Sequence, residues 1–380
     1  MSELAYAQQR PSTIDELAFL VAAAEKNNTA VVAGSPGRVP PGAQLTSLAY
    51  ADVSAFTRVL EYSVPDQVIQ VETGIKLGEL RHLLEKNNQW WPVYLPDEWT
   101  LLDAIDRGDS GAVEHRFLSV RDLVLGCTVV TGHAAGIITC GGRVVKNVTG
   151  YDMTKLFVGS HGTLGIVVAA HLRLYAKPSF SSTMRWEFVE CDEAVQLCRD
   201  LIDSGLPLYA VSILKERANR LWAVTVQAAG VQAVVDEVVE AASAMKKKKP
   251  KVLLGEKDVG YWKWLTKRFY ASEEEVVYLV APMTVLARMS SELAAVGDLE
   301  MRPFSGKCLV RGVSLDAICD IAAKFADSAV PIVVAGANDQ YNYVVKRTPE
   351  RDADGVRAEL QRRLKVQFDP GRVLNPFASL

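Results

Sequence analysis

A dense group of glycines between Gly141 and Gly165 restricts the fold of this chain more than any other feature of the sequence. The group interrupts a stretch in which we predict strands at 123–130, 137–139 and 165–174. Glycine adopts backbone dihedrals that other residues avoid, and it lets a ligand approach the backbone closely. The same stretch also contains Lys146, Asn147, Tyr151 and Asp152. Packing alone does not explain this combination, which indicates a site for a nucleotide cofactor.

The length of 380 residues predicts about two domains. Glycine density falls after Pro178, where strands and amphipathic helices begin to alternate. We therefore expect a glycine-rich first domain over 1–178, a second α/β domain over 179–350, and a C-terminal helix and tail over 351–380. The expected fold class is α+β, and no internal repeat is visible.

Several local patterns predict individual helices. Thr13 and Glu16 form a T-x-x-E capping box ahead of an apolar stripe, which predicts a helix from Ile14. A second amphipathic helix ends in four lysines at 246–249, and we interpret these as a solvated helix end rather than a nucleic-acid patch. A last helix repeats Val356, Leu360 and Leu364.

Composition and charge exclude several classes of protein. Hydrophobic residues make up 49% of the chain and the net charge is −3, so neither disorder nor electrostatic recruitment of nucleic acid is expected. No secretory signal and no apolar run long enough to span a bilayer is visible. None of the six cysteines lies in a C-x-x-C pair, so we expect no metal or iron–sulfur site in this chain. A reducing cytoplasm is the expected compartment.

Catalytic motifs are missing from the sequence. It contains no H-E-x-x-H, no G-x-S-x-G, no P-loop and no G-x-G-x-x-G after a strand, and it predicts no catalytic residue. A weaker candidate is the turn at Gly34, Ser35 and Gly37, which follows a predicted strand at 29–34. Successive backbone N–H groups in such a turn can bind phosphate, although an ordinary turn has the same composition.

Longer motifs carry a family resemblance. The chain contains G-G-R-V-V-K-N-V-T-G-Y-D-M-T-K-L at 141–156 and G-S-H-G-T-L-G-I at 159–166. It also contains V-L-E-Y-S-V-P-D-Q-V-I-Q-V-E-T-G at 59–74, V-R-D at 120–122 and F-D-P-G-R-V-L-N-P at 368–376. In these motifs the sequence resembles the FAD-binding domain of the vanillyl-alcohol-oxidase (PCMH-type) superfamily. Within that superfamily it is most similar to the FAD-binding E subunits of bacterial glycolate oxidase, also called glycolate dehydrogenase.

The resemblance implies a two-part FAD-binding domain, a ferredoxin-like α/β cap domain, and a C-terminal tail that returns to the first domain. FAD would lie between the two parts without a covalent link, because no histidine follows the first loop. The implied cofactor residues are Gly34, Ser35 and Gly37 at the phosphates; Lys146, Asn147, Gly150, Tyr151 and Asp152 around the flavin; and Gly162, Thr163, Gly165 and Ile166 as backbone contacts. For Tyr151, Leu156 and Ile166, core packing is the alternative interpretation.

The chain departs from the family pattern at two loops. In the first loop Pro36 has no N–H to donate. The second loop keeps the family register, with Thr100, Gly108, Ser110 and Gly111 as further cofactor candidates. Its double glycine, however, is replaced by Leu102 and Asp103. Asp103 would bring a negative charge to the place where the pyrophosphate normally binds.

The resemblance implies an FAD-binding subunit of a 2-hydroxy-acid (glycolate-type) dehydrogenase or oxidase complex. Its partners would be a glycolate-oxidase-like catalytic flavin subunit and an iron–sulfur subunit. Substrate oxidation would occur on the catalytic partner, because the histidine cluster of that subunit has no counterpart here. The complex could hold the chain peripherally at a membrane. Two alternatives stay open: a flavin-less scaffold subunit of such a complex, and an independent flavin oxidase of another alcohol.

Overall fold

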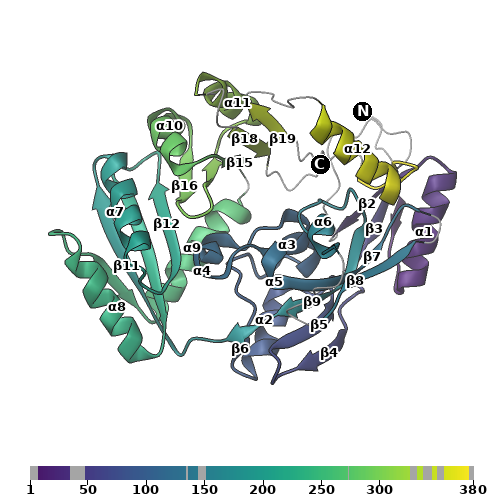
Figure 1. Ribbon diagram of the computed structural model, residues 1–380, viewed down its shortest axis with the longest axis horizontal. Helices are drawn as coiled ribbons and strands as arrows, with labels where there is room; N and C mark the ends of the chain where they lie inside the picture. Colours follow the sequence, from purple (N-terminus) through teal and green to yellow (C-terminus); the bar gives the residue numbers. More distant parts are fainter. Residues whose placement is uncertain are drawn as a thin grey trace.

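The computed structural model describes residues 7–34, 48–133, 136–143, 151–272, 274–325, 332–336, 345–348 and 355–375. Two halves lie side by side in Figure 1. The elements up to residue 176, drawn from purple to teal, form one half together with the yellow C-terminal helix, and the later teal, green and olive elements form the other. This is the α+β fold predicted from the sequence.

The first half contains a small parallel sheet in the order β1-β3-β2, formed by Ala7–Gln9, Leu48–Asp52 and Ala30–Gly34. Helix α1 (Ile14–Lys26) buries Leu17, Val21 and Ala24. At the start of this helix the predicted capping box is formed only in part. The Thr13 hydroxyl accepts the Glu16 N–H at 3.2 Å, but the Glu16 carboxylate accepts the N–H of Ser12, at 2.7 Å, instead of that of Thr13.

A five-stranded antiparallel sheet forms the second part of this half, in the order β4-β5-β9-β7-β8. Its strands are Val59–Ser63, Val68–Glu72, Ile166–Arg173, Val124–Val130 and Ile137–Gly141. The helices of this part are α2 (Leu77–Glu85), α3 (Leu101–Arg107), η1 (Gly111–Val113), α4 (Glu114–Phe117), α5 (Val120–Leu123) and α6 (Thr154–Phe157). The short strands β6 (Gln89–Trp90) and β10 (Tyr175–Ala176) pair beside it. The two sheets are the two parts expected of the FAD-binding domain.

The second half is built on one antiparallel sheet in the order β14-β11-β13-β12-β16-β17-β15-β18-β19. In chain order its strands are Phe180–Phe188, Leu208–Lys215, Trp222–Gly230, Lys251–Leu254, Val276–Val280, Asp298–Arg302, Lys307–Arg311, Ile332–Gly336 and Val345–Thr348. Its helices are α7 (Cys191–Asp203), α8 (Gln232–Ala244), α9 (Glu256–Tyr270), α10 (Met283–Val296) and α11 (Leu315–Lys324).

This cap domain contains the predicted ferredoxin-like unit twice. The first unit runs β11-α7-β12-β13-α8-β14 and the second runs β15-α10-β16-β17-α11-β18. In both units the strands lie in the order fourth, first, third, second, and β12 pairs with β16 to join the units. The sequence shows no internal repeat, whereas the structure repeats the order of strands and helices.

Alternating side chains of the cap sheet belong to two different cores. Along β12, Val211 and Ile213 join the core that the cap forms with helices α7, α8, α10 and α11. Their neighbours Ala210 and Leu214 belong instead to the core of the first domain. Successive residues of a strand point to opposite faces, so the inner face of the cap sheet packs against the first domain.

The C-terminal segment lies against the first domain. Helix α12 (Val356–Phe368) is followed by a stretch in which the N–H of Val31 donates to Val373 O at 2.7 Å and the N–H of Asn375 donates to Val31 O at 2.8 Å. The apolar repeat predicted for this helix is only partly buried. Leu364 packs against the core of the first domain. Val356 and Leu360 are exposed, so they do not extend the buried face of this helix.

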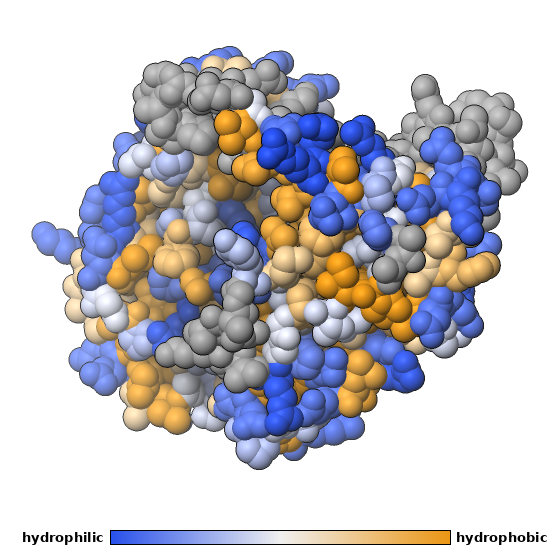
Figure 2. All heavy atoms as spheres, turned by 45° about the vertical axis from the view of Figure 1, so that its right-hand side comes forward, coloured by the Kyte–Doolittle hydropathy of each residue, from blue (hydrophilic) through white to orange (hydrophobic). Residues whose placement is uncertain are grey.

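The surface is mixed in character. Figure 2 shows hydrophilic and hydrophobic residues interspersed over the face that it draws. Among the described residues, no helix is both long and apolar enough to cross a membrane.

Candidate functional site

The second glycine loop of the sequence lies on the C-terminal end of α3. The N–H of Gly159 donates to Ile105 O at 2.8 Å, and the N–H of His161 donates to Asp106 O at 3.2 Å. Gly159 and Gly162 have φ of +81° and +72°, values that side-chain-bearing residues rarely adopt. A Cβ at Gly159 would meet open space within 4 Å. The backbone at Gly159 is therefore open to a ligand.

The C-terminal tail holds this loop from the other side. Lys365 Nζ donates to Thr163 O at 2.6 Å and to Leu374 O at 2.7 Å, and Asn375 Nδ2 donates to His161 O at 2.5 Å. Two buried polar atoms here, Ser160 Oγ and Asn375 Oδ1, have no hydrogen-bond partner among the described residues. Buried polar atoms normally have partners, so this pair fits a region that receives a polar ligand.

Several predicted cofactor residues already make internal contacts. The hydroxyl groups of Ser110 and Thr163 donate to the carbonyls of Leu118 and Ser160, at 2.6 and 2.7 Å. Gly111 faces Tyr94, whose carbonyl oxygen lies 2.4 Å from a Cβ built there, and Gly165 faces the Val129 side chain in the same way. Packing therefore explains the glycines at 111 and 165, and internal hydrogen bonds explain the hydroxyl groups of Ser110 and Thr163, without a bound cofactor.

The family pattern has its double glycine in the first turn of α3. In this chain the backbone N–H groups of that turn already have acceptors and are not free to bind a phosphate. Asp103 Oδ2 accepts the Thr100 N–H at 2.7 Å, and the Thr100 hydroxyl accepts the Asp103 N–H at 3.3 Å. The next two N–H groups, of Leu101 and Leu102, donate to backbone carbonyls at 2.9 and 2.8 Å. All four consecutive N–H groups are thus engaged, and the Leu102 side chain is buried in the core.

Some of the remaining residues predicted to bind FAD belong to the described part of the chain, and the others lie outside it. Ser35, Gly37, Lys146, Asn147 and Gly150, together with Pro36, lie outside the described residues. Gly34 ends β2, Gly108 is the left-handed C-cap of α3, and Ile166 begins β9 in the core. Tyr151 is 97% exposed and Asp152 is exposed as well, so core packing is the wrong explanation for Tyr151.

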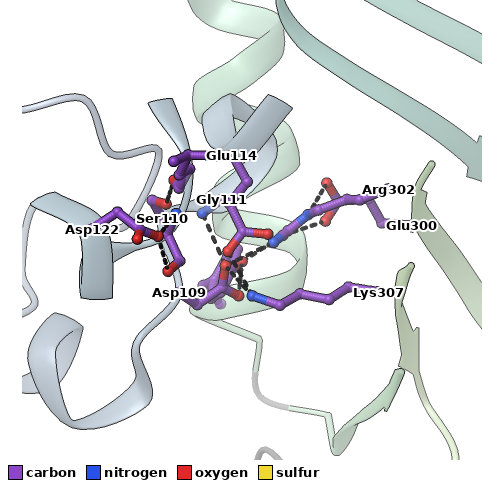
Figure 3. Close-up of polar contacts among 11 residues, drawn as sticks. Asp109, Ser110, Gly111, Glu114, Asp122, Glu300, Arg302 and Lys307 are labelled. Carbon is purple, nitrogen blue, oxygen red and sulfur yellow. Dashed lines mark hydrogen bonds and ion pairs between the residues drawn. The ribbon is translucent and has the colours of Figure 1, made fainter. Parts of the chain in front are cut away.

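A buried charged cluster joins the two domains close to these loops (Figure 3). Arg302 on β16 forms an ion pair with Asp109 of the first domain at 2.9 Å and with Glu300 at 3.1 Å. Lys307 on β17 contacts Glu114 at 2.5 Å and Asp109 at 3.4 Å. The Tyr270 hydroxyl of α9 donates to Asp109 at 2.6 Å. We call Asp109, Glu114, Glu300, Arg302 and Lys307 the interdomain charge cluster.

This cluster has three carboxyl groups and only two cations. For Asp109 burial favours the neutral acid, but Arg302 and Lys307 outweigh it and hold the pKa well below its usual range. Burial and the neighbouring Asp109 charge raise the pKa of Glu114 to about 7, against the opposing effect of Lys307. Glu114 is therefore the carboxyl of the cluster that keeps its proton in weak acid and loses it around pH 7.

A pocket of about 420 Å³ lies at the edge of the cluster and is lined by both domains. Gly108 and Gly159 of the predicted cofactor loops line it, as do Glu114, Phe304 and Lys307. Within the described residues, Glu114 Oε2 is buried without a hydrogen-bond partner. A carboxyl group with a raised pKa beside a cavity is typical of functional sites.

Sequence reasoning missed the cluster, because its members come from positions nearly two hundred residues apart. The available signal was weak. Asp298, Glu300 and Arg302 alternate with Leu299 and Met301 along one strand, so the three charged residues share one face of it. Buried charges of this kind require partners, but the sequence gives no sign that the partner is Asp109.

The glycine loops, the unpartnered Ser160 hydroxyl and the interdomain pocket fit a nucleotide cofactor, whereas the first turn of α3 does not. Against this background, residues 7–150 match a protein-family model described as "FAD binding domain". Glycolate oxidase subunit GlcE of Escherichia coli (strain K12) is 30% identical over 195 residues, which cover 50% of this chain and 54% of that protein. Residues 7–150 thus match an FAD-binding domain, and this match supports FAD as the cofactor.

Other relatives are named as a glycolate oxidase subunit, as D-lactate dehydrogenases or as FAD-linked oxidoreductases. Glycolate oxidase subunit GlcD of Bacillus subtilis (strain 168) is 32% identical over 150 residues, which cover 38% of this chain and 31% of that protein. Among solved structures, alkyldihydroxyacetonephosphate synthase shares the fold with a TM-score of 0.70 at 15% identity, over 97% of this chain and 75% of that one. The chain spans about half the length of GlcE and a third of GlcD.

Proposed function

We propose that this chain is the FAD-binding subunit of a 2-hydroxy-acid dehydrogenase or oxidase complex of the glycolate type. The observation that carries the proposal is the FAD-binding domain at residues 7–150, followed by a cap domain that encloses a pocket against it. The likeness to GlcE, itself named as a subunit of glycolate oxidase, supports the substrate class and the assignment to a complex.

In this proposal the cofactor lies between the two sheets of the first domain and reaches the interdomain pocket. Gly159, Gly162 and the Ser160 hydroxyl would contact it, with Asn375 and Lys365 holding their loop in place. When bound, FAD supplies hydride and electron transfer. The cap contributes Phe304 and Lys307 to the lining of the pocket, and Glu114, whose pKa is raised to about 7, accepts a hydrogen bond there from the Lys307 ammonium group.

The proposed partners are a glycolate-oxidase-like catalytic flavin subunit, on which the substrate is oxidised, and an iron–sulfur subunit. The likeness to both GlcE and GlcD supports the first partner, and the family resemblance of the sequence supports the second. We place the complex in the cytoplasm, where a reducing environment suits six cysteines that form no disulfide among the described residues.

An assay of dye reduction with glycolate or D-lactate as the substrate tests whether oxidation occurs on the partner subunit. We expect the purified chain alone to be inactive and the chain coexpressed with its glycolate-oxidase-like partner to be active, because the catalytic residues are supplied in trans. Size-exclusion chromatography of the coexpressed proteins provides the accompanying evidence for a complex. Turnover by the chain alone would contradict the proposal and favour an independent oxidase.

A flavin-less scaffold is the second candidate function. The engaged N–H groups of residues 100–103 favour it, because they leave that turn no donors for the pyrophosphate. A scaffold would retain the same fold and the same partner surfaces, and it would not bind FAD when the cofactor is supplied.

Substituting Asp103 separates the charge of this residue from its capping role. In Asp103→Asn the side-chain oxygen can still accept the Thr100 N–H, but the negative charge is gone. If FAD binds beside this turn, we expect its Kd to fall about fivefold, since a screened pair of like charges costs roughly 1 kcal/mol. Fluorescence titration with FAD measures this change.

The matched control is Glu16→Gln, which removes a similar capping carboxylate at the start of α1. It should leave the Kd for FAD unchanged. An unchanged Kd in Asp103→Asn would mean that the cofactor phosphates do not approach this turn.

A further inference from the structure

A cavity of about 670 Å³ lies on the domain boundary, away from the cofactor loops. It is lined by the segment after β6, by the linker at 177–181, and by one face of α9. None of the residues predicted to bind FAD lines this cavity. Its volume is within the range typical of sites for small organic molecules.

Aromatic rings form one continuous wall of this cavity. The ring centroids of Trp90 and Tyr94 are 6.3 Å apart, and those of Tyr94 and Trp262 are 5.6 Å apart. The Tyr94 hydroxyl donates to Gln227 at 2.5 Å, and Trp262 Nε1 donates to Thr183 at 2.8 Å. The Tyr94 bond ties the first domain to the cap sheet, the Trp262 bond lies within the cap, and each holds one of the rings in place.

The side chains that line the cavity include four cations and three carboxylates, and the buried Asp258 carboxylate lies behind them, where it accepts hydrogen bonds from Ser181 and Gln227. Arg81 and Lys177 are neutralised by ion pairs with Asp97 and Glu85. Lys263 and Lys267 also line the cavity, four residues apart on the same face of α9. Within the described residues, the ammonium groups of these two lysines form no ion pair or hydrogen bond, and the rim also carries the exposed carboxylate of Glu98.

We propose that this cavity is a second ligand site, for a flat aromatic molecule of two or more rings that carries one acidic group. The rings would stack on the wall of Trp90, Tyr94 and Trp262, and the acidic group would lie near Lys263 and Lys267. Aromatic walls with a few charged groups give such sites their selectivity. Because residues of both domains line the cavity, its ligand bridges the first domain and the cap.

Two probes with the same ring system test both parts of the proposal. Anilinonaphthalene sulfonate has three aromatic rings and one acidic group, and N-phenyl-1-naphthylamine has the same rings without the acid. Titration of the full chain, followed by probe fluorescence, should give one saturable site. We expect the Kd of the sulfonate to be at least fivefold lower than that of the neutral probe.

Variants on α9 locate the site. Val259→Trp places a large side chain in the cavity from an exposed helix position, and it should raise the Kd of both probes at least tenfold. The double variant Lys263→Ala/Lys267→Ala should abolish the preference for the sulfonate and leave the neutral probe unchanged. The matched controls are Lys257→Ala and Lys257→Trp, because Lys257 is exposed on the same helix but does not line the cavity.

The titration is repeated with saturating FAD to separate this site from the cofactor site. An unchanged Kd for the sulfonate, combined with the expected variant effects, supports the proposal whether or not FAD binds. Non-saturable binding, competition by FAD, equal Kd values for the two probes, or indifference to Val259→Trp would each overturn it. Circular dichroism of the Trp variants establishes that they are folded.

Discussion

Replacing Arg302 with methionine should lower the free energy of unfolding by about 3–5 kcal/mol, the largest loss expected from a single substitution in the interdomain charge cluster. The Arg302 side chain is 3% exposed and forms ion pairs with both Asp109 and Glu300. Methionine keeps much of the volume but leaves two buried carboxylates with only Lys307 to balance them. Removing one partner of a buried ion pair costs more than the pair itself contributes, because the remaining charge stays desolvated.

Chemical denaturation, followed by tryptophan fluorescence and by circular dichroism, measures this loss. Arg363→Met is the control, since Arg363 forms an exposed ion pair with Glu359 on α12 and its loss should hardly move the midpoint. A loss below about 1 kcal/mol for Arg302→Met would contradict the buried cluster and the domain contact that it forms.

Stability should also depend on the proton held by Glu114. Burial and the Asp109 charge raise the pKa of this carboxyl from the ordinary 4.5 to about 7. Between these two values the folded state binds a proton that the unfolded state has lost. The contribution of Glu114 is therefore fully present below pH 4.5 and falls by about 1.4 kcal/mol per pH unit up to about pH 7, above which it is lost.

The variant Glu114→Gln isolates this effect. Buried histidines act with the opposite sign, because burial lowers the pKa of His115, His161 and His171 and their neutral forms are favoured in the folded state. They are common to both proteins, so we compare wild type and Glu114→Gln at each pH. The wild type should lose stability relative to the variant from pH 5 to 7 and be the less stable protein at pH 8. A constant difference across this range would contradict the assignment of the proton to Glu114.

Much of the fold could be predicted from local patterns. The capping residues before Ile14 and the alternating strands around Gly141 are short-range signals, and the structure forms a helix and strands there. The duplicated cap could not be predicted, because its two units are related by the order of strands rather than by shared residues. Exposure of Val356 and Leu360 was also missed, since an apolar repeat does not reveal whether a partner surface exists.

Only those parts of the candidate site that are formed by residues close together in the sequence could be predicted. Glycines at 159 and 162 were recognised from spacing, and they have the left-handed backbone that glycine permits. That the Asp103 carboxylate caps its own helix was not anticipated. The charge at this position suggested only repulsion of a phosphate. Contacts such as Asp109 with Arg302 depend on how two domains pack, which residue spacing along the chain does not encode.

The visible absorption spectrum of the purified chain tests the central claim, that this FAD-binding domain holds its cofactor. After expression and incubation with excess FAD, followed by gel filtration, we expect a yellow protein with the flavin absorption bands and about one FAD per chain. Acid precipitation should release the FAD into the supernatant, because no covalent link is expected. A correctly folded, colourless chain that takes up no FAD, alone or with its partner, would contradict the account.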